Sequence, residues 1–337
     1  MTWVKTYALS DPLCYQTAIQ AATVELWPTS GGQFHGELTQ IRMSKLWMQR
    51  FYVNLPQIQL VANEPGRKVF GFTTEPNVPS FEHRGTGVRS GEIAFSGVGA
   101  FHQRAPADFR HGTMSLRDDD VHAAYNALIG REFPERKLRP VLRPGPELMS
   151  RLLKFHRIVG QLAHDTPDLL DLPELVRAIE QQLVHLMIRC FADGVSGDFA
   201  SGARRHEAIL RRFEDFLAAN PDRPLYLTEI CEGIGVAERT LRAACEEYLG
   251  MGPIRYLTMR RMHLVRRALV AADATETNVT RVVTDRGFWE LGRFSGTYRR
   301  LFGESPSETL RRPPTEKRIS LNRPSSLAAS KGAAGLH

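Results

Sequence analysis

Three arginines, Arg239, Arg242 and Arg293, occupy outward positions in two segments that have the periodicity of short helices. An arginine can grip O6 and N7 of guanine together, so arginine on an exposed helix is suited to reading bases in a major groove. On an isolated helix, arginines more often only solvate the surface. The duplication of the surrounding sequence reverses that preference and favours contact with DNA.

The elements that position these arginines occur twice in the chain. Residues 227–236 recur at 279–288, and residues 241–253 recur at 294–306. Each copy is typical of a short helix, a tight turn with glycine, and a second helix whose inner face repeats at i, i+4, i+7 and i+8. We therefore predict helix-turn-helix motifs at about 227–249 and 279–302, each offering its second helix to a major groove.

The outward residues of the two second helices are the candidate DNA contacts. They are Arg239, Arg242, Glu246, Arg293, Thr297 and Arg300. Between the motifs, an apolar stripe predicts one helix over Ile254–Val270, roughly 25 Å long at 1.5 Å per residue. The stripe consists of Ile254, Leu257, Met262, Val265 and Leu269. Such a helix could hold two recognition helices about one DNA turn apart, and we expect its Arg266 and Arg267 to contact phosphate.

The charge of this region agrees with a DNA-binding role but is weak evidence by itself. The 337-residue chain has a net charge of +7, and residues 204–312 contain 19 arginines against 15 acidic residues. Many solvated surfaces are equally basic, so the placement of the arginines carries more weight than their sum.

The preceding half of the chain predicts a β-rich domain followed by a helical hairpin. Short β-prone runs separated by Gly, Pro and Asn fill residues 36–118, as in a small sandwich or barrel. Amphipathic patterns over about 147–191 predict two antiparallel helices, which either mediate dimerisation and bracing or simply cover the sheet. The predicted fold class is α+β, with a sensing or dimerisation domain at 1–191, a flexible linker at 192–203, a DNA-binding domain at 204–312 and a disordered tail at 313–337.

Neither catalytic chemistry nor a bound cofactor is indicated. The four cysteines form no CxxC pair, and no HxH pair accompanies His83, His102 and His111, so we expect reduced thiols and no metal site. No signal peptide or long apolar stretch is present, which predicts a cytoplasmic protein without a membrane span. A pocket in the first domain could be lined by Trp47, Phe51, Phe70, Phe72, His83 and Arg84, although aromatic residues in strands are usually core.

Residues 204–312 resemble the DNA-binding domain of AraC/XylS-type transcription regulators. The resemblance rests on the segments GFWELGRFSGTYRRLFGESPSETLR (287–311) and GVAERTLRAACEEYLGMGPIRYLTMRRM (235–262). It implies two helix-turn-helix motifs on one long helix, and an N-terminal sensing domain that is often a cupin-like barrel. The variant GFWELGRF looks like the same segment in regulators of ethanolamine-utilisation operons, but residues 1–200 do not extend that likeness.

The match has departures in both recognition helices. Ala237 stands where the family usually has a capping serine, which forfeits about 1 kcal/mol. Gly292 and Gly296 replace residues that are often serine and arginine in the family, and a glycine inside a helix costs roughly 1 kcal/mol relative to alanine. The base-reading positions of the family therefore carry over to Arg239, Arg242 and Arg293.

Three functions compete on this evidence. The leading one is a sequence-specific regulator that binds promoter DNA, responds to an unidentified small molecule, and pairs as a homodimer. RNA polymerase is a further partner if the protein activates transcription. A DNA-repair alkyl-transfer protein can carry the same module, but it needs a nucleophilic cysteine in a metal or basic cluster, and Cys14 stands alone. The third is a constitutive DNA binder without an effector.

Overall fold

The structure is a computed structural model, and it describes residues 2–76, 78–97, 99–135, 139–194, 202–221 and 225–312. The predicted tail at 313–337 and residues 195–201 of the predicted linker lie outside the described residues. The ends of that linker are helical, because residues 192–194 close one helix and residues 202–203 open the next. No helix of the described ranges is long and apolar enough to cross a membrane.

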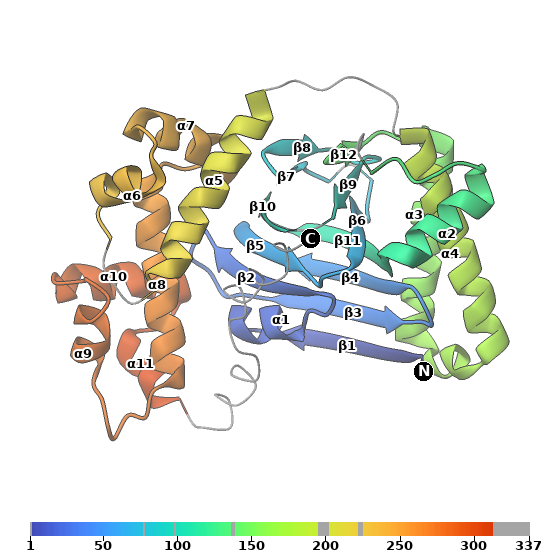
Figure 1. The fold of residues 1–337 in the computed structure, drawn as a ribbon. Coiled ribbons are helices and arrows are strands. Elements are labelled where there is room, and N and C mark those ends of the chain that lie inside the picture. Colours follow the sequence, from blue (N-terminus) through green and yellow to red (C-terminus); the bar gives the residue numbers. More distant parts are fainter. Residues whose placement is uncertain are drawn as a thin grey trace.

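Two antiparallel sheets form the N-terminal half, as the α+β prediction requires (Figure 1). The larger sheet has the order β1-β3-β4-β11-β6-β9-β12. Its strands, in that order, are Trp3–Leu9, Gly36–Arg42, Trp47–Val53, Phe109–Arg117, Arg67–Thr73, Ile93–Ser96 and Val141–Leu142. The central strand β11 places Thr113 opposite Gln49 of β4 on one side and opposite Gly71 of β6 on the other.

The smaller sheet has the order β2-β5-β10-β7-β8, and every neighbouring pair is antiparallel. Its strands, in that order, are Ala22–Pro28, Gln57–Asn63, Ala100–Ala105, Phe81–His83 and Thr86–Val88. Side chains from both sheets line one internal cavity, so the sheets face each other. Strands β1 and β2 and the short helix α1 (Pro12–Ala18) lie before residue 36, where the sequence pattern predicted no strand.

Helices α2 (Asp118–Ile129), α3 (Pro146–Asp165) and α4 (Pro173–Gly194) pack against the larger sheet. The ring of Phe191 on α4 lies 5.7 Å from that of Phe70 on β6 and 5.5 Å from that of Phe95 on β9. A 3-10 turn, Pro167–Asp171, joins α3 and α4. Of the two roles left open for the predicted hairpin, covering the sheet is therefore the one that this packing supports.

The C-terminal half is helical and lies on the other side of the sheets from α2–α4 (Figure 1). It consists of α5 (Gly202–Ala219), α6 (Leu227–Ile234), α7 (Glu238–Leu249), α8 (Pro253–Ala271), α9 (Val279–Thr284), α10 (Leu291–Phe302) and α11 (Pro306–Arg311). Its first core cluster takes in Trp27 of β2 and Ile58 of β5, so the smaller sheet packs directly on this half.

Candidate nucleic-acid interface

The first helix-turn-helix consists of α6 and α7, joined by a turn at Gly235. The φ angle of Gly235 is 63°, a left-handed conformation that favours glycine, and its N–H donates to the last turn of α6. Helix α7 then begins after Ala237, whose side chain makes no capping hydrogen bond. The inner face of α7 is buried at Leu241, Cys245, Tyr248 and Leu249, which leaves its opposite face to solvent.

The second helix-turn-helix repeats this backbone with α9 and α10. Gly287, the counterpart of Gly235, has a φ angle of 76°. Asn278 caps α9 by accepting a hydrogen bond from the N–H of Arg281. Phe294 and Tyr298 lie on the inner face of α10 and form a hydrophobic core with the C-terminal part of α8. Two different sequences therefore build the same turn and the same exposed second helix.

Helix α8 connects the motifs as a single element of 19 residues, which is about 28 Å long. Its first half, including Tyr256 and Met259, belongs to the core of the first motif. Its second half, including Val265 and Leu269, belongs to the core of the second motif. The predicted stripe is wrong at its first position, because Ile254 is 59% exposed at the start of the helix.

The structure places the candidate DNA contacts on the outward faces of α7 and α10. Residues Arg239, Arg242, Glu246, Arg293 and Arg300 are exposed, and Thr297 is half-buried. Their ion pairs are local: Arg242 bonds Glu238 at 2.9 Å, and Arg293 lies 3.5 Å from Glu290. Such exposed pairs are worth little, so these guanidinium groups can exchange partners cheaply.

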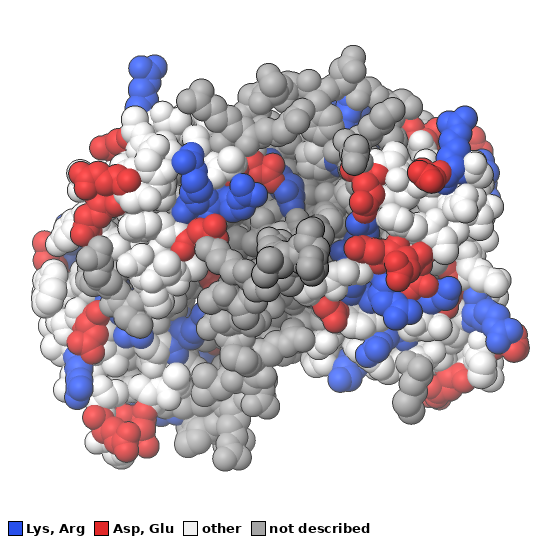
Figure 2. Space-filling view, in the orientation of Figure 1, with Lys and Arg blue, Asp and Glu red and all other residues white. Residues whose placement is uncertain are grey.

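Arg239 is the least restrained of these arginines. No ion pair or hydrogen bond joins its side chain to another residue in the described ranges. It follows the N-terminal residue of α7, Glu238, and the N-terminal part of a recognition helix is the part that meets base edges. The acidic and basic side chains of this half are interspersed in the view of Figure 2, in keeping with its small net charge.

An exposed tryptophan beside α10 escaped the sequence interpretation. Trp289 is 73% exposed and lies in the turn just before α10. An exposed large aromatic residue at the start of a predicted recognition helix is a signal that the sequence does contain.

The expected phosphate contact of Arg266 is wrong for this conformation. Arg266 is only 5% exposed, and its guanidinium pairs with Asp11 at the start of α1 and with Glu304 at 3.3 Å. Arg312 joins the same cluster, 3.2 Å from Asp11 and 2.6 Å from Glu304. Burial raises the pKa of Asp11, but the charge and hydrogen bond of Arg266, the N–H of Leu13 and the charge of Arg312 together outweigh it and hold that pKa below its usual value. Arg267 is half-buried, 3.6 Å from Glu25 of β2, and its phosphate contact stays a prediction.

A second polar cluster joins the halves at Tyr256, which is fully buried at the start of α8. Its hydroxyl donates to Glu214 of α5 at 2.7 Å, and Glu214 lies 3.2 Å from His102 of β10. Burial raises the pKa of Glu214, but the hydrogen bond and charge of His102, the charge of Arg260 and the hydrogen bond of Tyr256 together outweigh it, so the pKa lies below the ordinary value. The ring of Trp27 packs edge-on against Tyr256 with centroids 5.4 Å apart. No local sequence pattern marks these four residues as neighbours.

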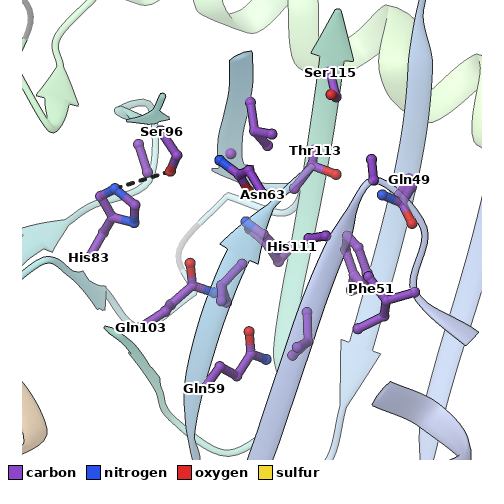
Figure 3. Close-up of a pocket in the computed structure, with 18 of the residues that line it drawn as sticks. Gln49, Phe51, Gln59, Asn63, His83, Ser96, Gln103, His111, Thr113 and Ser115 are labelled. Carbon is purple, nitrogen blue, oxygen red and sulfur yellow. Dashed lines mark hydrogen bonds between the residues drawn. The ribbon is translucent and has the colours of Figure 1, made fainter. Parts of the chain in front are cut away.

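Two of the six residues proposed to line a pocket do so. Phe51 and His83 do line the cavity between the sheets (Figure 3). Phe70 and Phe72 belong to the core shared with α3 and α4, and Trp47 stacks under Arg67 with 4.2 Å between the guanidinium carbon and the ring centroid. Arg84 points the other way, out of the sheet, and pairs with Glu207 of α5.

Comparison with known families identifies the helical half. A family model described as a helix-turn-helix domain matches residues 230–312, which run from α6 through α11. The C-terminal domain is a helix-turn-helix domain of the AraC/XylS type. The match begins inside α6 and includes both recognition helices and the whole of α8.

Related proteins are described as operon regulators. The chain is 33% identical over 165 residues to the "Probable thc operon regulatory protein" of Rhodococcus erythropolis. The aligned region covers 47% of this chain and 48% of that protein. It is 26% identical over 165 residues to "XylDLEGF operon transcriptional activator 1" of Pseudomonas putida, covering 49% of each. The chain therefore spans about half the length of these relatives. Among solved structures, the AraC-like transcriptional activator CuxR aligns with a TM-score of 0.41 at 14% identity, over 78% of this chain and 94% of that one.

Proposed function

We propose that this protein is a ligand-responsive transcription regulator that binds a specific double-stranded DNA site through α7 and α10. The observation that carries the proposal is the pair of exposed, arginine-bearing recognition helices mounted on one helix, α8. The names of the related operon regulators support the same conclusion. Because α8 contributes to both cores, the two motifs would meet two successive major grooves as one rigid unit.

In the proposed complex, Arg239 and Arg242 read bases through α7, and Arg293 does so through α10. Glu246, Thr297 and Arg300 lie further along the same two faces and complete the contact surface. Arg242 and Arg293 can exchange their ion pairs with Glu238 and Glu290 for contacts to guanine at little cost in free energy, since these intramolecular pairs are exposed to solvent.

We also propose that the protein is not an enzyme and acts in the cytoplasm beside its DNA, as a homodimer and, if it activates, with RNA polymerase as a partner. Three of the four thiols favour this over alkyl transfer. Burial raises the pKa of Cys190 and of Cys245 to about 12, and it also raises the pKa of Cys231. These three thiols therefore stay protonated at neutral pH and are poor nucleophiles.

The test begins with selection of a binding site from genomic fragments by the full chain, followed by footprinting. Arg239→Ala, Arg242→Ala and Arg293→Ala should each weaken binding to that site by about 1–3 kcal/mol, and much less on random DNA. Arg151→Ala, at an exposed arginine of α3, is the matched control and should change neither. Protection of a single groove, or equal losses on selected and random DNA, would contradict the proposed reading of bases by two helices.

A further inference from the structure

A cavity lies between the two sheets, and the DNA-binding role does not use it. Its walls come from β4, β6, β9 and β11 of the larger sheet and from β2, β5, β7 and β10 of the smaller one (Figure 3). The space open to the centres of water molecules is about 70 Å³. Since one water needs about 10–15 Å³ by this measure, the cavity has room for a molecule the size of about five to seven waters.

Polar groups without protein partners face this space. Gln103, His111 and Thr113 are each more than nine-tenths buried, and no hydrogen bond joins their side chains to another residue of the described ranges. Gln57 has the same character, since neither its amide nitrogen nor its amide oxygen has a partner there. A buried polar group without a partner is destabilising. Several of them along one cavity indicate a binding site for a molecule with hydrogen-bonding groups.

The lining of the cavity carries no charge. None of the lining residues is Lys, Arg, Asp or Glu. Burial lowers the pKa of His83 and of His111 to about 3, so both rings are neutral at physiological pH. A carboxylate or ammonium group placed here would lose its hydration without gaining an opposite charge, which is strongly unfavourable. The apolar part of the wall, with Phe51, Phe101 and Phe109, suits a ring or short hydrocarbon.

The smaller sheet is a wall of one layer between this cavity and the DNA-binding domain. Successive residues of a strand point to opposite faces. On β5, Gln57 and Gln59 face the cavity while Ile58 packs in the core of the first motif. On β10, Gln103 faces the cavity and His102 contacts Tyr256. A ligand that moved these strands would therefore move the docking surface of α5 and α8.

We propose that this cavity binds a small uncharged molecule with an amide- or hydroxyl-type hydrogen-bonding group on an apolar body, and that β2, β5 and β10 carry the effect of binding to the DNA-binding domain. Gln103 and Thr113 bind the polar group of the ligand, because an amide and a hydroxyl can each donate and accept. The effect on DNA rests on the proposed function, whereas ligand binding itself does not.

The test uses the full chain and pairs of molecules that differ in charge but hardly in shape: benzamide with benzoate, and phenylacetamide with phenylacetate. Thermal melting and calorimetry without DNA measure binding. The amides should raise Tm with concentration, and the carboxylates should not. Carboxylates that bind as tightly as their amides, or no shift with either amide, would overturn the assignment.

Thr113→Val locates the site, because valine keeps the shape of threonine and removes the hydroxyl. It should weaken binding of the better amide at least tenfold, while Thr39→Val on β3, outside the cavity, should leave binding unchanged. Equal effects of the two variants would overturn the assigned site. The amide should also shift affinity for the selected DNA site, and this shift should vanish in Thr113→Val. If the amide binds but Arg239→Ala leaves DNA binding intact, the proposed DNA reading fails and the ligand site stands.

Discussion

Arg266 and Asp11, which are 255 residues apart in the chain, form a buried ion pair between α8 and the start of α1. Oδ1 of Asp11 accepts from the N–H of Leu13 and caps α1, while Oδ2 pairs with Arg266. One carboxylate therefore both starts a helix of the first half and anchors the long helix of the second. Glu304 and Arg312 complete a cluster of two cations and two anions. The two halves are therefore tied together by charge at α8 as well as by apolar packing at Trp27.

The Asp11→Asn variant tests the contribution of this pair. Asparagine is also a good N-cap, so α1 should remain, but Arg266 would keep only Glu304 as an anionic partner. Removing one partner of a buried ion pair is strongly destabilising, and with Glu304 still present we expect a loss of about 2 kcal/mol in the free energy of unfolding. Denaturant titration measures it. Glu174→Gln, which removes the partner of Arg177 on the exposed surface of α4, should cost less than about 0.5 kcal/mol. A similar cost for both variants would contradict the role given to Asp11.

Stability should fall in mild acid because of buried histidines. Burial lowers the pKa of His83, His111 and His263 to about 3, against about 6.5 in the unfolded chain. Between these values the unfolded chain binds protons that the folded chain does not, so the free energy of unfolding decreases as pH falls from 6.5 towards 3. The slope is up to about 1.4 kcal/mol per pH unit for each histidine.

Urea titrations at several pH values give the slope. His263→Gln should reduce it by about the contribution of one histidine, whereas His164→Gln, at an exposed position of α3, should leave it unchanged. A slope that is the same in His263→Gln and in the unaltered chain would mean that this ring does not stay neutral in the folded protein.

Two glycines in helices should respond to alanine in opposite directions. An added Cβ on Gly296 of α10 meets no atom within 4 Å, so Gly296→Ala should stabilise the protein by about 1 kcal/mol through helix propensity. An added Cβ on Gly233 of α6 would lie 2.2 Å from Cε2 of Phe216, so Gly233→Ala should destabilise by about 1–3 kcal/mol through overpacking. Denaturant midpoints measure both. Destabilisation by Gly296→Ala would show that α10 needs the glycine for a reason other than space.

The fold class was predictable because most elements bury one face and expose the other. Helices α7 and α10 show their inner faces at regular spacing, and so do α3 and α4. Strand β2 was missed because its alternation of apolar with polar residues is short. Ala22, Val24 and Leu26 alternate with Thr23 and Glu25, but the pattern ends in the apolar run Leu26–Pro28, where Trp27 packs on the helical half. Helix α2 was missed because it buries only Val121 and Tyr125, too few to produce a clear period.

The candidate site was predictable only where its geometry is local. The outward positions of Arg239, Arg242 and Arg293 follow from the spacing of buried residues within the same helix. The burial of Arg266 does not follow from local spacing, because its partner Asp11 lies in another part of the chain. The cavity is equally non-local, since Gln103 of the smaller sheet meets His111 and Thr113 of the larger sheet only because the two sheets face each other.

The docking of the second motif on the β-rich half should depend on Gly31, in the loop between β2 and β3. An added Cβ on Gly31 would lie 1.8 Å from the carbonyl oxygen of Arg300 on α10, so Gly31→Ala cannot keep this contact. Because Gly31 does not have a positive φ, alanine fits its backbone, and the damage should fall on the docking rather than on the loop. We expect docking to weaken by about 1–3 kcal/mol, as for other overpacked contacts.

Hydrogen exchange of the full chain resolves this effect by segment. In Gly31→Ala, amides of the loop before β3 and at the C-terminal end of α10 should exchange about tenfold faster, while β4 and β11 stay protected. Gly87→Ala on β8 is the matched control, because its added Cβ would approach only a side-chain oxygen of Glu82, at 3.8 Å. Equal exchange at the end of α10 in both variants would mean that the contact of Gly31 with Arg300 does not hold the second motif in place.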